Sequence, residues 1–365
     1  MATLTYKCPS CGSPLVFDGR SQDMTCGSCG NSFETETVQQ VNAIEQKTEK
    51  EPNSTNWQVE ERPFSPEEAA RTRSYSCSSC GAELLTDETT VATNCAFCGS
   101  PSILPTQFTQ DTRPSVIIPF TVSKEQATAM FHNYFKGKKL IPNLFLRNNT
   151  IDEIRQLYVP YWLFTCQADA QITYNATQVR SYRSGQYRVT QTRHFVVNRA
   201  GTLDFRDLPV DASSKMDNEI TESIEPYNMS GAINFSPETL SGALANRADV
   251  NSEESKRRAD QRIRTTTENT FRSTVMGYDS VIPRASNIQI PDGTSMPALY
   301  PLWHITTKKE GKTYTFAING QTGELTCNIP FSMAKLISWV VGITGGITAV
   351  GFLILFLIAY LGVLT

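Results

Sequence analysis

The sequence predicts an α+β fold in three parts: two small β modules, a mixed body of helices and antiparallel sheet, and a C-terminal transmembrane helix. Three observations predict this fold. A four-cysteine pattern occurs twice between residues 8 and 98, helical and strand periodicities alternate between residues 108 and 330, and residues 336–364 form one long apolar run. A chain of 365 residues has room for about two or three domains.

The cysteine pattern reads C-x2-C-x14-C-x2-C in both copies, and the second copy follows the first by 69 residues. The ligands would be Cys8, Cys11, Cys26 and Cys29 in the first copy and Cys77, Cys80, Cys95 and Cys98 in the second. Four thiolates at this spacing can close a tetrahedral shell around one zinc ion, which leaves no open position for a catalytic water. The sequence therefore predicts two zinc ribbons that hold two structural ions.

A disulfide framework is the alternative for eight cysteines. We disfavour it because secreted frameworks rarely repeat paired CxxCG knuckles. Zinc-binding thiolates must stay reduced, which predicts a cytosolic location for the N-terminal region. The first seven residues, MATLTYK, contain no apolar core of a signal peptide.

Composition and motif positions divide the chain into five segments. We name residues 1–36 ribbon 1 and residues 73–106 ribbon 2. Residues 37–72 between them are polar and rich in Glu, Gln, Asn and Pro, which is typical of a flexible acidic linker. Residues 107–330 form the α+β body, and residues 334–365 form the membrane anchor.

The body begins with a short strand at residues 116–120. A helix follows, started by a capping box of Ser123 and Gln126 and stopped near Gly137. We expect further strands at 158–164, 170–174 and 313–318, a hairpin over 180–197 that turns at Ser184 and Gly185, and a second helix over 252–275.

Residues 158–164 and 299–305 resemble each other. Both segments place a proline two residues before a tryptophan, as Pro160 before Trp162 and Pro301 before Trp303. This similarity predicts a body of two related halves, each a helix followed by sheet. Two independent edge strands that each carry a proline are the alternative.

The C-terminal run, residues 336–364, contains only apolar, aromatic, small and hydroxyl side chains. It exceeds the roughly 20 residues that cross a bilayer, and Trp339 and Tyr360 lie near its ends, where aromatic rings suit the interface. Lysines precede the run and none follows it, which predicts a single-pass tail anchor in the cell membrane with the N-terminal bulk in the cytoplasm. A re-entrant hairpin bending at Gly345 and Gly346 is the alternative.

The charge of the ribbons argues against nucleic acid as their partner. The whole chain has a formal net charge of −3, ribbon 1 carries two basic against four acidic side chains, and residues 75–104 carry three acidic and no basic side chains. Phosphate contacts provide most nucleic-acid affinity and require Lys or Arg. We therefore expect the ribbons to contact proteins.

The sequence shows no recognisable catalytic set. The segment Gly311-Lys312-Thr313 lacks the upstream glycine of a phosphate-binding loop, and the three histidines, His132, His194 and His304, are not spaced as a metal pair. We therefore expect no enzymatic activity, no catalytic residues and no small-molecule substrate.

Short motifs in the body support a family resemblance. They are YVPYW from residue 158, LPVDASSK from 208, SIEPY from 223, FSP and LSG within 235–242, and NGQTG from 319. Together with the cysteine patterns and the apolar run, they make the chain similar to the YdjG-type membrane proteins of Gram-positive bacteria, which carry TFIIB-type zinc ribbons. One departure is Ala96, because a proline often follows the first cysteine of that knuckle.

This resemblance implies a membrane adaptor that works beside phage-shock-protein-A-like and flotillin-like (SPFH) proteins in envelope stress. The function expected from the sequence is therefore recruitment of partner proteins to the membrane without catalysis. A membrane-tethered nucleic-acid-binding protein is the alternative, because zinc ribbons serve both kinds of contact.

Overall fold

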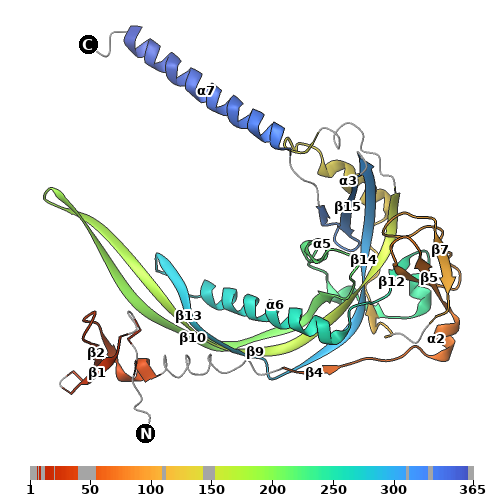
Figure 1. Cartoon of the computed structure of the whole chain (residues 1–365), viewed down its shortest axis with the longest axis horizontal. Coiled ribbons are helices and arrows are strands. Elements are labelled where there is room, and N and C mark those ends of the chain that lie inside the picture. The colour runs from red at the N-terminus through yellow and green to blue at the C-terminus, as the bar shows by residue number, and fades with distance from the viewer. Residues whose placement is uncertain are drawn as a thin grey trace. The chain divides into compact units, whose positions relative to one another are not determined.

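The computed structural model describes residues 6, 8–9, 13–19, 21–39, 55–108, 112–142, 153–309, 312–327 and 332–360 (Figure 1). The chain folds into two compact units that interleave along the sequence. Unit 1 comprises Met1–Glu61, Trp162–Val210 and Val250–Pro297, and unit 2 comprises Arg62–Tyr161, Asp211–Asp249 and Ala298–Thr365. The predicted α+β class is confirmed, with a sheet-rich body and one long C-terminal helix.

The two ribbons form antiparallel sheets in different settings. Ribbon 1 has a three-stranded sheet of its own, in the order β1-β2-β3. Ribbon 2 has β5 between β6 and β7, and β12 joins this sheet to that of the body. The bounds are Leu15–Asp18 for β1, Asp23–Cys26 for β2, Ser32–Glu34 for β3, Thr72–Cys77 for β5, Glu83–Asp87 for β6, Ile103–Thr106 for β7 and Leu244–Asn246 for β12.

The main sheet of unit 2 runs in the order β11-β8-β14-β9-β12-β6-β5-β7, and β15 and β16 extend it from β14. Its long strands are β9 (Glu153–Ser184) and β14 (Asp292–Lys309), and both continue into unit 1. The shorter elements are β8 (Val116–Ile117), α3 (Lys124–Tyr134), α5 (Asn218–Ser223), β11 (Ile233–Asn234), β15 (Lys312–Asn319), β16 (Leu325–Cys327) and 3-10 turns at Met229–Gly231 and Pro237–Leu240.

Unit 1 is built on the hairpin of β9 and β10 (Tyr187–Asp211). The turn between these strands contains Gly185 at a φ of +62°, which confirms the predicted hairpin. On the other side of β9, β13 (Ser280–Gln289) pairs antiparallel with it. The helix α6 (Ser252–Ser273) corresponds to the helix predicted over 252–275, and it buries Ala259 and Ile263.

The helix α3 begins and ends at the residues that its sequence predicts. The Ser123 hydroxyl accepts from the Gln126 backbone N–H, and the Gln126 side chain accepts from the Ser123 N–H, which completes the capping box. Gly137 beyond the helix has a φ of +79°. The helix packs Phe131 against Phe316 of β15, with 4.8 Å between the ring centroids, and so covers the sheet.

The prediction of a flexible linker over residues 37–72 is wrong for the C-terminal part of this segment, which is folded. It contains β4 (Asn56–Val59), which pairs with β14, and α2 (Pro66–Ala70), which a capping box of Ser65 and Glu68 starts. Trp57 and Phe64 are buried, and these two aromatic side chains anchor a stretch whose average composition is polar. Residues 40–54 of this segment lie outside the described residues.

Equivalent hydrogen bonds in the two halves of the body support the prediction that these halves are related. The carbonyl of Pro160 accepts from the Ala212 N–H, and the carbonyl of Pro301 accepts from the Gly320 N–H, both at 2.9 Å. The indole of Trp162 donates to the Val250 carbonyl at 3.1 Å. In the same way, the indole of Trp303 donates to the Val122 carbonyl at 2.9 Å. Val250 and Val122 each directly precede the N-cap residue of a helix, α6 and α3.

The halves exchange their first strands. The strand β8 of the first half pairs in parallel with β14 of the second, while β12 of the second half pairs in parallel with β9 of the first. Ile117 lies opposite Leu299, two residues before Pro301, and Ala245 lies opposite Tyr158, two residues before Pro160. The registers are identical, and β9 and β14 lie inside the sheet, so the alternative of independent edge strands is wrong.

The C-terminal helix α7 spans Met333–Tyr360. Its segment Met333–Ile358, 26 residues, is long and apolar enough to cross a membrane, and it is the one such helix in the part of the chain that the structure describes. At 1.5 Å per residue it is about 39 Å long, which exceeds a hydrocarbon core of about 30 Å. The predicted single span therefore has a continuous helix to support it, without a bend at Gly345 and Gly346.

Candidate metal centres

The four cysteines of ribbon 2 come together at one point. Cys77 ends β5, and Cys80 follows it in a tight turn in which Gly81 donates to the Cys77 carbonyl at 2.8 Å. The second pair repeats this turn, since Gly99 donates to the Cys95 carbonyl at 3.1 Å. Both glycines adopt positive φ values, +67° and +73°, which only glycine reaches without strain.

The sulfur geometry of ribbon 2 fits a tetrahedral metal ion. The Sγ atoms of Cys77 and Cys98 are 3.7 Å apart, and those of Cys80 and Cys95 are 3.5 Å apart. All four lie within 4.8 Å of one another. Metal–sulfur bonds of about 2.3 Å in a tetrahedron would place the sulfurs about 3.8 Å apart, whereas a disulfide would require about 2.05 Å. The structure therefore brings the predicted ligand set of ribbon 2 together in a cluster that can hold a metal ion.

Ribbon 1 brings together three of its four predicted ligands. The Sγ atoms of Cys8, Cys26 and Cys29 lie within 4.8 Å of one another, with 3.6 Å between those of Cys8 and Cys29. Gly30 donates to the Cys26 carbonyl at 2.9 Å, as Gly99 does to Cys95 in ribbon 2. Cys11 lies outside the described residues.

Basic side chains of the body approach the backbone of ribbon 2. The ammonium of Lys215 donates to the Cys80 carbonyl at 3.2 Å, and the guanidinium of Arg155 donates to the Cys95 carbonyl. A divalent ion held by four thiolates carries a net charge of about −2, so two nearby cations offset that charge. Sequence reasoning missed both residues, because they lie far from the cysteines along the chain and belong to no motif.

His304 also packs against ribbon 2. It is fully buried, its ring lies 5.8 Å from that of Phe97, and it shares a hydrogen bond with the backbone of Ala96. Burial lowers the pKa of His304 to about 4, so the imidazole is neutral at pH 7. His304 contacts the knuckle backbone and is not one of the clustered residues of ribbon 2.

The pKa values of the thiols respond to two opposing effects. Burial raises the pKa of the Cys95 and Cys80 thiols. At Cys77 the opposing hydrogen bonds from the backbone N–H groups of Cys80 and Ser79 outweigh burial, so its pKa falls to about 7. The knuckle amides thus favour the thiolate that a metal ion requires.

The two ribbons differ in the strand that follows the first knuckle. Positions eight and nine after the first cysteine are Val16 and Phe17 in ribbon 1, and Leu85 and Thr86 in ribbon 2. Val16 is 68% exposed and Phe17 53%, whereas Leu85 is 7% exposed and Thr86 is fully buried. Leu85 belongs to the body's core, where it packs with residues such as Tyr158, Phe235 and Ala245. Two apolar side chains of ribbon 1 are therefore exposed at the positions where ribbon 2 is covered.

Comparison with known proteins places the chain in a family. It is 34% identical over 343 residues to the uncharacterized protein YdjG of Bacillus subtilis (strain 168), a match that covers 94% of this chain and 95% of that protein. The chain belongs to the YdjG family. No protein-family model matches it, and no solved structure matches it. The two cysteine clusters and the candidate membrane helix are the features of this YdjG-family member that carry functional information.

Proposed function

We propose that the protein is a membrane-anchored, non-enzymatic adaptor that uses ribbon 1 to recruit partner proteins to the cytoplasmic face of the cell membrane. The observation that carries the proposal is the exposure of two apolar side chains of β1, Val16 and Phe17, in a module whose cysteines can bind a metal ion. In ribbon 2 the matched residue Leu85 is buried in the chain's own core. The matched strand of ribbon 2 thus packs in the body, and that of ribbon 1 leaves apolar side chains available to a partner.

The ion in both ribbons is proposed to be zinc with a structural role. All the ligands are thiolates, the sulfur spacing suits Zn–S bonds of about 2.3 Å, and a shell of four cysteines has no open position for substrate. A module of about 30 residues buries too little apolar surface to fold alone, so zinc binding would provide its folding free energy. The ribbons are therefore platforms for contact and hold no reacting group.

Anchoring is proposed to occur through α7, with the folded units in the cytoplasm. At the start of α7, Lys335 donates to the Ile141 carbonyl at 2.6 Å, and Lys139 lies 4.5 Å from the Trp339 ring centroid. Lysines and a tryptophan at this end of the helix are typical of a cytoplasmic membrane interface. The adaptor would then present its partners at the inner surface of the membrane.

The partners proposed are the phage-shock-protein-A-like and SPFH proteins that the family resemblance implies, acting in envelope stress. The test is copurification from membranes of cells that carry the tagged full-length protein, followed by quantification of both partner types. We expect recovery of at least one of them to fall about tenfold in the double variant Val16→Ser/Phe17→Ser, since a few side chains near the centre of an interface carry most of its binding energy.

The matched control is the double variant Val91→Ser/Leu104→Ser. Val91 and Leu104 are 62% and 61% exposed, and both lie in ribbon 2. Recovery that is unchanged in the ribbon 1 variant, or that falls only in the ribbon 2 variant, would contradict the assignment of recruitment to ribbon 1.

A further inference from the structure

The tip of the β9–β10 hairpin, residues 179–194, is a second surface with a distinct character. The last pair between β13 and β9 is Ser280 with Thr177, so among the described residues the hairpin continues beyond it with two strands. Every residue of the hairpin tip except Val189 is exposed. An isolated two-stranded ribbon is marginally stable in water, so a segment of this kind gains order when something binds it.

The hairpin carries a concentrated positive charge. Between Asp169 and Asp204 the sequence contains no carboxylate, while it contains five arginines: Arg180, Arg183, Arg188, Arg193 and Arg199. The whole chain has a formal net charge of −3, so this segment opposes the charge of the rest. Uninterrupted positive charge of this kind attracts anionic surfaces.

The charge of α6 shows what makes the hairpin unusual. Lys256 pairs with Glu253 at 2.7 Å, and four acidic residues accompany the six basic ones of that helix. The hairpin has no such internal counter-charges, because its nearest carboxylates in sequence are Asp169 and Asp204. Basic charge on α6 is therefore offset in large part by the helix itself, whereas the strands of the hairpin tip offset none of theirs.

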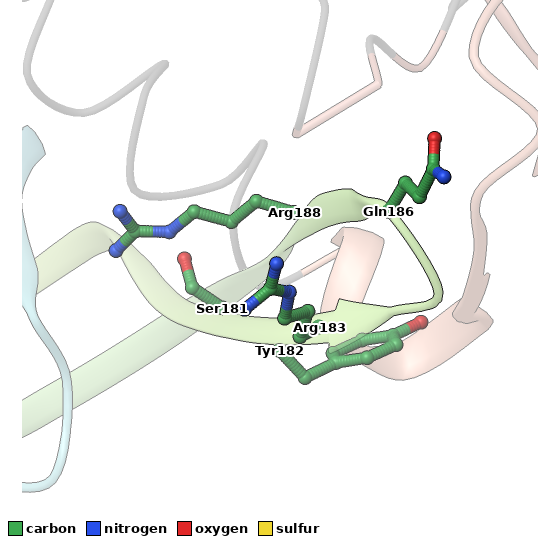
Figure 2. A pocket seen from close by; sticks show the side chains of 5 residues that line it. All are labelled: Ser181, Tyr182, Arg183, Gln186 and Arg188. Carbon is green, nitrogen blue, oxygen red and sulfur yellow. The ribbon is translucent and has the colours of Figure 1, made fainter.

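Two of the arginines converge on a pocket at the hairpin tip. The pocket has a volume of about 400 Å³ and is lined by Ser181, Tyr182, Arg183, Gln186 and Arg188. The Ser181 and Thr190 hydroxyls lie 3.0 Å apart across the strands. Figure 2 shows Ser181 and Arg188 extending from neighbouring strands, with the Tyr182 ring on the opposite side of the ribbon from them. Arg183 and Arg188 both line this pocket, and like charges that lie opposite each other on neighbouring strands destabilise the pairing. An anion bound between them would offset this repulsion.

Aromatic side chains accompany the arginines. Tyr182 is 54% exposed and Tyr187 is 77% exposed, so the tip presents amphipathic rings next to its guanidinium groups. Tyrosine is enriched where proteins meet the headgroup level of a bilayer, and arginine binds phosphate with two parallel hydrogen bonds. The combination fits a phosphate-bearing surface of phospholipids.

We propose that the hairpin tip binds the anionic phospholipid headgroups of the membrane that anchors the protein. The proposal rests on the anchoring by α7, because anchoring would hold the chain at a surface with a high local concentration of headgroups, an advantage that free phosphate lacks. Clusters of four or more arginines next to a membrane are typical of binding to anionic lipids. The interaction gives the protein a second, charge-dependent contact with its membrane.

The test uses the full chain incorporated into lipid nanodiscs of phosphatidylcholine alone or with about one-third phosphatidylglycerol, at low salt. Hydrogen–deuterium exchange of peptides covering residues 179–194 is measured in both discs. We expect exchange at the tip to slow about tenfold in the anionic discs and to recover in about 0.5 M salt, because salt screens contacts between exposed charges.

The triple variant Arg180→Gln/Arg183→Gln/Arg188→Gln is expected to lose this protection. The matched control, Arg62→Gln/Arg73→Gln/Arg257→Gln, removes the same charge from exposed arginines elsewhere and is expected to keep it. Equal exchange in both discs, or equal loss in both triple variants, would overturn the proposal. Failure of the chain to enter phosphatidylcholine discs would instead contradict anchoring by α7.

Two further arms identify the ligand. Millimolar inorganic phosphate added to the phosphatidylcholine discs is expected to leave exchange at the tip unchanged, and protection by phosphate alone would reject the lipid headgroup as the source. Single-stranded RNA is expected to protect the tip less than the anionic lipid does at the same salt concentration. Stronger protection by RNA would overturn the proposal in favour of nucleic acid.

Discussion

Ribbon 1 and ribbon 2 share a cysteine spacing and differ in what covers them. Both fold their knuckles with the same backbone hydrogen bonds, as those of Gly30 to Cys26 and of Gly99 to Cys95 show. Ribbon 2 is built into the main sheet through β12 and contributes Leu85 to the core, whereas ribbon 1 keeps a small sheet of its own. The comparison teaches that the cysteine spacing brings the thiols together in both copies, while residues outside the pattern decide whether the module is built into the main sheet or keeps a separate sheet.

The largest difference between the two ribbons is expected in the stability that the protein loses when one metal ion is removed. Cys26→Ser and Cys95→Ser change matched positions, and we expect each variant to lose about one of two zinc equivalents, measured by elemental analysis. Apparent free energies of structural zinc binding are about 10–16 kcal/mol, so Cys95→Ser should destabilise unit 2 by several kcal/mol. That loss corresponds to a fall in melting temperature of roughly 10 °C or more in circular dichroism.

Cys26→Ser should leave the main melting transition within about 2 °C of the wild type, because ribbon 1 has its own sheet. Equal melting temperatures for the two variants would show that ribbon 1 supports the fold as much as ribbon 2 does, which would contradict the proposed difference between them.

Truncation of the matched strand residues tests the same distinction without touching the metal. Leu85→Ala removes a buried side chain and should cost about 2–5 kcal/mol of unfolding free energy, whereas Val16→Ala at an exposed position should change it by no more than about 0.5 kcal/mol. Chemical denaturation of the detergent-solubilised protein measures both. A similar cost at the two positions would show that Val16 is covered.

The smallest effect concerns the ion pair between ribbon 2 and the body. Arg247, next to β12, forms an ion pair with Glu83 of β6, and the two side chains are 33% and 43% exposed. Solvent screens such a pair, so a double-mutant cycle with Arg247→Gln and Glu83→Gln should give a coupling energy below about 1 kcal/mol. A coupling of several kcal/mol would mean that electrostatics, and not the core around Leu85, attaches ribbon 2.

The cysteine clusters, the helix starts and the repeat could be predicted from sequence because each depends on residues close together along the chain. The knuckle turns need a glycine four residues after a cysteine, and the α3 capping box needs only Ser123 and Gln126. The repeat was recognisable because Pro160 and Pro301 keep the same distance to a tryptophan. These signals are local, so tertiary context changes them little.

The incorporation of ribbon 2 into the main sheet could not be predicted, because it depends on strand pairing between residues far apart in sequence. Leu85 lies opposite Ala245, and Arg155 and Lys215 reach the knuckles from the body. Nothing within ribbon 2 specifies which strand it will join. The folded part of the linker was missed for a related reason, since the buried side chain of Trp57 packs beside Gly293, far along the chain, where a β-carbon would collide with its ring.

The most direct test of recruitment by ribbon 1 is an affinity measurement with purified components. The full-length protein in nanodiscs, loaded with two zinc equivalents, is titrated with the phage-shock-protein-A-like and SPFH proteins of the host bacterium. The account predicts saturable binding of at least one of them that weakens about tenfold, or about 1.4 kcal/mol, in Val16→Ser/Phe17→Ser and stays unchanged in Val91→Ser/Leu104→Ser. Absence of binding by both proteins, or equal affinities for the two variants, would contradict it.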